Sequence, residues 1–124
     1  MINTKKIYNT LLSDSRITAI VPSDNILNAY PNGIEVFPCI VFIDENQSDI
    51  EYADNFSSAS RCEVEIHIFS KKLDSYVTTS DISVILAEVF NEELWHCSSN
   101  GEISDPDPTV EHRVLRFEKS IYNN

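Results

Sequence analysis

Residues 62–69 read CEVEIHIF, and their side chains alternate between apolar and polar from Cys62 to Ile68. Such alternation is typical of a β-strand with one face on the core and the other toward water. The apolar face holds Cys62, Val64, Ile66 and Ile68, and the polar face holds Glu63, Glu65 and His67. The strand therefore needs a hydrophobic layer on one side. Its polar face is either an acid–base or metal site or the solvated side of a sheet.

Helices are predicted where apolar residues recur at intervals of three and four. One covers residues 4–13, and a short helical turn after it is closed by Pro22, which has no N–H to continue a helix. The strongest apolar stripe runs over residues 82–90, with Asp74 or Ser75 as the expected N-cap. Both main helices are expected to pack on the sheet.

Further strands are predicted before and after this helix. Residues 37–43 are apolar on both parities, which is typical of a strand covered on both faces. A short extended piece is expected within residues 25–33, a turn-rich connection over 96–111 and a last strand over 112–122. The prediction is an α+β fold, with two main helices packed on a mostly antiparallel sheet of about four strands.

Residues 44–60 form a long polar connection between two predicted strands, although hairpin loops usually have about 2–5 residues. The segment also contains Ile50, Tyr52 and Phe56, which a purely solvated loop does not need. Two interpretations have equal weight. Either the strands extend into the segment, or the segment contacts a partner.

Composition predicts one globular domain over residues 1–124, with 42% hydrophobic and 23% charged residues. The net charge of −11 disfavours tight binding to nucleic acid, because such a surface repels phosphate. The sequence contains no apolar run long enough for a signal peptide or a spanning helix, and its three cysteines are widely spaced. Synthesis and folding in the cytosol, without a membrane partner, are expected.

No residue pattern predicts catalysis, a metal or a cofactor. Cys62 and His67 are five positions apart on a strand and so point to opposite faces. Glu63, Glu65 and His67 have spacings that acid–base chemistry allows, but an open strand lacks the convergent groups of a cleft. With two glycines in the chain, a Gly-rich phosphate loop is excluded. On a solvated face, Glu65 is expected to tolerate alanine within about 0.5 kcal/mol.

Several blocks together resemble the tail completion, or tail terminator, proteins of long-tailed bacteriophages and of their prophages. They are the first helix, the block NAYP…FPCIVF, the strand VEIHIFSK and the Arg-containing last strand, and they cover almost the whole chain. The resemblance implies a structural protein of the virion, assembled in the host bacterial cytoplasm. Its copies form a ring, usually a hexamer, that caps the head-proximal end of the tail tube at the tail–neck junction and docks to the head connector.

The expected partners are therefore other copies of the chain, the tail tube protein and the head connector or neck protein, with DNA only passing through the lumen. The candidate interface residues are Ile50, Tyr52, Phe56, Glu63, Glu65, His67 and Arg116. His112 and Arg116 share a parity on the last strand and could pair with the 63–67 row if the two strands are neighbours. The alternatives are a head–tail connector or adaptor, a small acidic inhibitor that mimics DNA, and a cytosolic enzyme that uses Glu63, Glu65 and His67.

Overall fold

A five-stranded sheet forms the frame of the molecule in a computed structural model that describes residues 4–28, 36–53 and 56–122. The strands are β1 (Ile26–Asn28), β2 (Cys39–Ala53), β3 (Phe56–Lys71), β4 (His96–Ile103) and β5 (Val110–Tyr122). Their order in the sheet is β1-β2-β3-β5-β4, and all neighbours are antiparallel except the β1–β2 pair. The predicted α+β class is confirmed, with five strands where about four were expected.

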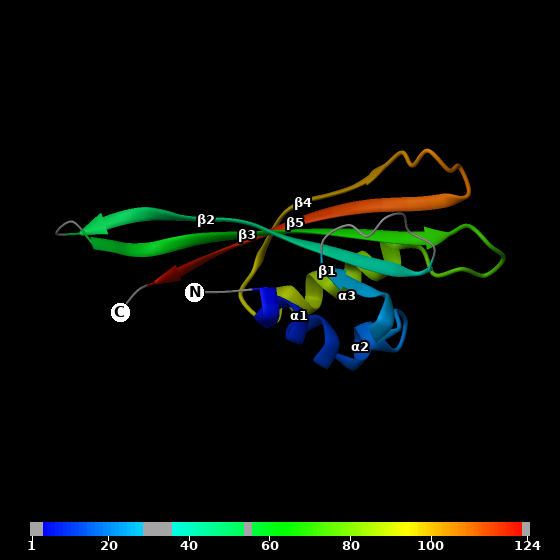
Figure 1. The fold of residues 1–124 in the computed structure, drawn as a ribbon, viewed down its shortest axis with the longest axis horizontal. Helices are drawn as coiled ribbons and strands as arrows, with labels where there is room; N and C mark the ends of the chain where they lie inside the picture. The colour runs from blue at the N-terminus through cyan, green and yellow to red at the C-terminus, as the bar shows by residue number, and fades with distance from the viewer. Residues whose placement is uncertain (1–3, 29–35, 54–55, 123–124) are drawn as a thin grey trace.

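The helices lie together on one side of this sheet (Figure 1). They are α1 (Thr4–Ser13), α2 (Ser15–Thr18) and α3 (Thr79–Glu92), and a single 3-10 turn covers Ser23–Asn25. Asp14 caps α2 by accepting a hydrogen bond from the backbone N–H of Arg16. None of the described helices has the length and apolar character needed to cross a bilayer.

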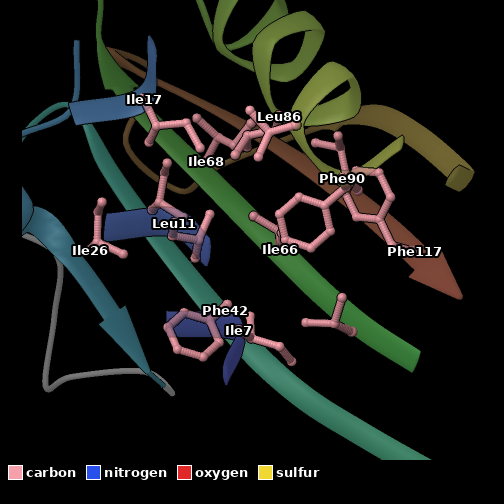
Figure 2. Close-up of a cluster of buried hydrophobic side chains, with 14 of the residues drawn as sticks. Ile7, Leu11, Ile17, Ile26, Phe42, Ile66, Ile68, Leu86, Phe90 and Phe117 are labelled. Atoms are coloured by element: carbon pink, nitrogen blue, oxygen red, sulfur yellow. The ribbon is translucent and has the colours of Figure 1, made fainter. Parts of the chain in front are cut away.

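The main core lies between the helices and one face of the sheet. Ile66 and Ile68 of β3 are fully buried against Leu11 of α1 and Leu86 of α3, and Phe90 stacks on Phe117 with ring centroids 4.6 Å apart (Figure 2). Burying one such side chain contributes about 1.5–3 kcal/mol. The apolar parity of residues 62–69 and the apolar stripe over 82–90 therefore meet as predicted.

A second, smaller apolar cluster covers part of the opposite face. It consists of Cys39, Val41, Phe69 and Val110, with Leu27 and Phe37 packed against it. Consequently β2 is buried on both faces between Cys39 and Phe42, as its two apolar parities predict. The strand follows directly on Pro38, which occupies the expected place before the first residue of the strand.

Two predictions about element boundaries are wrong. The segment predicted to be turn-rich contains β4, an edge strand that pairs only with β5 among the described residues. Its sequence, HCSSNGEI, has no apolar alternation because most of its side chains are exposed. The N-cap of α3 is Thr78, whose hydroxyl accepts a hydrogen bond from the backbone N–H of Asp81, and not Asp74 or Ser75.

The long connection at residues 44–60 is an extension of two strands. β2 and β3 remain paired from Asp44↔Val64 to Ala53↔Phe56, with register shifts on the way, and β5 accompanies β3 as far as Ala59↔Tyr122. The two strands continue as a narrow ribbon beyond the helices (Figure 1). We call residues 44–60 the arm. The first of the two interpretations of this segment is confirmed.

Candidate functional site

Polar side chains gather on the face of the sheet that the helices leave open, where β3 and β5 lie side by side. The register places Glu65 opposite Arg116 and Glu63 opposite Glu118, and it places Phe69 opposite His112. These residues alternate with core residues, so the strand geometry directs them away from the helices. The predicted neighbourhood of the 63–67 row and the last strand is therefore confirmed.

A continuous hydrogen-bonded chain runs along this face. The Nδ1 atom of His67 lies 2.8 Å from Nε2 of His112, and Nε2 of His67 lies 2.5 Å from Oε1 of Glu65. The other carboxylate oxygen of Glu65, Oε2, forms an ion pair with Arg116, whose Nη2 atom lies 2.8 Å away. Phe69 stacks on the His112 ring with centroids 4.1 Å apart. We call His67, His112, Glu65 and Arg116 the histidine network.

Burial distinguishes this network from a solvated row. His67 and His112 are 6% and 8% exposed, and the Glu65 side chain is 13% exposed, whereas that of Arg116 is 50% exposed. The interpretation of this row as the wet side of a sheet is therefore wrong for His67 and Glu65. His112 and Arg116 of β5 contact these two side chains, which the alternation within one strand does not reveal.

Burial also determines the protonation of two groups on this face. It lowers the pKa of His112, and the charge of His67 lowers that pKa further, although Asp105 acts in the opposite direction. Burial raises the pKa of the Cys39 thiol to about 11. Both groups therefore favour their neutral forms at neutral pH.

A second set of charges lies beside the network on the same face. Arg61 of β3 forms an ion pair with Glu118 of β5 and lies 3.5 Å from Glu63. All three side chains keep between 28% and 45% of their surface exposed. Screening by solvent makes such pairs worth about 0–1 kcal/mol each. Their position at the start of the arm makes them available to a partner.

The network cross-links β3 and β5. A groove of about 500 Å³ lies away from it, between α3 and β4, and is lined partly by Val84, Trp95 and Cys97. In the part of the chain that the structure describes, no group of three or more His, Cys, Asp or Glu residues could hold a metal ion. The two imidazoles and the carboxylate are held by one another and by Arg116.

The seven predicted interface residues fall into two groups. Glu63, Glu65, His67 and Arg116 lie together on the open face, with Glu65 and His67 engaged inside the chain. Ile50 and Tyr52 belong to β2 and Phe56 to β3, so all three are part of the arm. The structure thus brings four of the seven together and places the other three on the element that projects.

One polar contact had no signal in the sequence. The Glu111 carboxylate accepts hydrogen bonds of 2.6 Å from both the backbone N–H and the hydroxyl of Thr79, and one of 2.8 Å from Tyr76. It thereby satisfies an otherwise unpaired N–H of the first turn of α3. The residues are about 30 positions apart in sequence, so only the packing of α3 on β5 reveals the contact.

A comparison with solved structures identifies a chain of similar fold. A chain in a solved structure titled "Virion of native gene transfer agent (GTA) particle" has a TM-score of 0.57 and 11% sequence identity. The match covers 94% of this chain and 92% of that chain, and at this identity it shows a shared fold. No curated protein sequence matches.

A sequence profile of the family described as tail completion protein gp17 matches residues 5–122. Because this match spans almost the whole chain, the chain belongs to the tail completion protein gp17 family. It is a structural protein of the bacteriophage tail and a component of the virion. The resemblance drawn from the sequence is confirmed at this level.

Proposed function

We propose that copies of this chain form a ring, with six copies as the expected number, that closes the head-proximal end of the tail tube and joins it to the head connector. The observation that carries the proposal is the β2–β3 arm of a tail completion protein, which extends past the helices (Figure 1). A ring requires one patch of a copy to meet a different patch on the next copy. A projecting arm suits this requirement because it reaches away from its own core.

Among the described residues, the β2 side of the arm has a strand edge without a pairing partner. β1 pairs with β2 only from Ile40 to Phe42, so in the described residues β2 beyond Phe42 pairs with β3 alone. An unpaired strand edge is a template for another strand. The proposed interface therefore comprises the arm residues Ile50, Tyr52 and Phe56 together with the open-face residues Glu63, Glu65, His67 and Arg116. For these four open-face residues, we expect the neighbouring copy to contact the part of each side chain that remains exposed.

Charge supports a role beside DNA that passes without binding. The net charge is −11, and the arm contains five carboxylates without a single Lys or Arg. A lumen lined by carboxylates repels the phosphate backbone. Changing lumen-facing carboxylates to Lys should slow DNA ejection, and unchanged ejection would contradict this part of the proposal.

The test of the ring is a tube-capping assay with the tail tube protein of the same phage. The unmodified chain should arrest tube growth, and electron microscopy should show a ring at one tube end. In the test variant, Asn-Gly replaces residues 49–60, because Ser48 and Arg61 are register partners that a two-residue turn can join. This variant should retain a cooperative thermal melt and lose capping.

A matched control is Glu88→Gln, which changes an exposed residue on α3 and should leave capping intact. Tubes that grow unchanged with the natural chain would overturn the ring-cap proposal. If the chain then bound connector rings instead, the head–tail connector alternative would replace it. Capping by the arm-shortened variant would show that the arm is not the interface.

A further inference from the structure

The facing nitrogens of His67 and His112 impose a limit on how many protons this buried pair can hold. A neutral imidazole has one N–H and one acceptor nitrogen, whereas an imidazolium has two donors and no acceptor. The 2.8 Å separation between Nδ1 of His67 and Nε2 of His112 therefore needs one of these two nitrogens without a proton. Two imidazolium rings would direct two N–H groups at each other.

The contacts on the other side of His67 determine which nitrogens carry protons. The Arg116 ion pair keeps Glu65 ionised, and an ionised carboxylate only accepts hydrogen bonds, so Nε2 of His67 carries a proton. In the neutral pair, His112 donates from Nε2 to Nδ1 of His67. After one proton is added, His67 donates from Nδ1, and the proton of His112 moves to its own Nδ1. A second added proton leaves no acceptor between the rings.

In the part of the chain that the structure describes, the charged groups around the pair come from β3, β5 and the β4–β5 loop. From β3, Glu65 faces the pair, and from β5, Arg116 opposes any added positive charge. The β4–β5 loop contributes Asp105, whose charge favours the protonated form of His112. Lys71 forms an ion pair with Asp107 and lies over the Phe37 ring. On β2, Cys39 lies in the same row as Phe69 and His112, and burial keeps its thiol protonated. On β4, the register partner of His112 is the apolar Ile103.

We propose that the His67–His112 pair is an acid-sensitive clasp between β3 and β5, which is closed with up to one added proton and opens when both imidazoles are charged. The clasp spans the His67 row, which β1 still reaches through Val41, and the His112 row, which holds Phe69 and Cys39. The row of Ile66 is the last that β1 reaches, through Phe42, and the next row is Glu65 opposite Arg116. Opening the clasp therefore loosens the contact between β3 and β5 within the body of the sheet, on the side of the Glu65–Arg116 row that lies away from the arm. This device does not depend on the ring proposal.

The direct test is an NMR titration of the natural chain between about pH 8 and pH 4. His96 is exposed and serves as the internal reference among the three histidines of the chain. The pair should take up its two added protons in two steps that the ring signals of both histidines report, as interacting sites do. Amide exchange at residues 65–68 and 112–116 should rise at least about tenfold with the second step. Independent single steps, or an unchanged exchange rate at the second step, would overturn the proposal.

A pair of variants isolates the clasp. His112→Gln removes one imidazole and should abolish the acid-induced rise in exchange, leaving a single step for His67. His96→Gln removes an exposed imidazole and should behave as the natural chain does. Persistence of the acid-induced opening in His112→Gln would refute the clasp. If that variant fails to fold, the titration of the natural chain still decides the question.

Discussion

Ile66 and Glu65 are adjacent in β3, and the sheet gives them opposite surroundings. Ile66 is fully buried under the helices, and Glu65 lies on the other face between His67 and Arg116. The alternation in the sequence predicts this division of faces. It does not predict that the second face is also largely covered at Glu65, because that cover comes from neighbouring strands.

Ile66→Asp should unfold the domain, so that its thermal melt shows no cooperative transition. The change buries a carboxylate without a partner, which costs several kcal/mol, against a total stability of roughly 5–15 kcal/mol for a domain. Thermal melts followed by circular dichroism would measure this effect. The control is Val84→Asp on α3, where the side chain is 55% exposed, and it should melt within a few degrees of the natural chain. Similar melts for both variants would contradict the face assignment.

Glu65→Ala should lower the free energy of unfolding by about 1–3 kcal/mol, because it removes the acceptor that His67 and Arg116 share inside the network. Urea unfolding at neutral pH would measure the loss. Glu63→Ala is the control, since that side chain is 35% exposed and its change should stay within about 0.5 kcal/mol. Equal losses in the two variants would show that the network adds nothing. This expected loss replaces the prediction from sequence, in which Glu65→Ala changes the free energy of unfolding by no more than about 0.5 kcal/mol.

At the scale of elements, the accuracy of the sequence prediction follows the strength of the hydrophobic pattern. The stripe of α3 and the alternation of β3 each form one side of the core, so their residue types are dictated by burial. β4 has no such pattern, because it is an edge strand held by backbone pairing to β5 with exposed side chains. The sequence predicts the start of α3 too early because Asp74, Ser75 and Thr78 are all good caps, and only the packed chain shows that Thr78 is used.

The first turn of α3 should give the molecule an acid-sensitive contact at Glu111. Burial raises the pKa of Glu111, but hydrogen bonds from Thr79 and Tyr76 outweigh it, and the pKa lies below its usual value of 4.5. The unfolded chain then binds the proton more readily, so stability is complete above about pH 4.5 and falls as the pH decreases through the folded pKa. Glu111→Gln should flatten the dependence of unfolding free energy on pH between about pH 5 and 3. Asp14, Glu92 and Asp107 also have lowered pKa values, so part of the slope will remain.

The matched control for this measurement is Glu88→Gln on the exposed side of α3. Its unfolding free energy should follow the same pH profile as that of the natural chain. A profile for Glu111→Gln that is as steep as the control would show that the carboxylate at the helix start is not linked to stability.

At the scale of the molecule, the sequence predicts the class of fold but not the order of strands. β5 inserts between β3 and β4, and both α3 and β4 separate it from β3 along the chain. The His67–His112 contact joins residues 45 positions apart, and periodicity within either strand carries no information about it. The arm shows the same limit: its polar sequence allowed both a loop and a pair of strands, and the pairing of β2 with β3 decided between them.

The net charge of −11 should make the whole molecule more stable when salt is added. Repulsion among carboxylates opposes the compact state, and the screening length decreases from about 30 Å at 0.01 M salt to about 10 Å at 0.1 M. The melting temperature should therefore rise over this range, equally in NaCl and KCl. A fall would mean that ion pairs such as Arg16–Glu92 outweigh the repulsion.

The place of β5 in the sheet also has a consequence for synthesis of the chain. Residues 56–103 are synthesised before residues 110–122, so β3 waits with one edge unpaired and β4 waits without its partner until β5 has emerged. The β2–β3 hairpin is local in sequence and can form first. A nascent chain at this stage presents an open edge beside the apolar side chains of β3, a template for aggregation. Translation through residue 122 closes that edge, so a pause before β5 lengthens the period in which a chaperone must protect the chain.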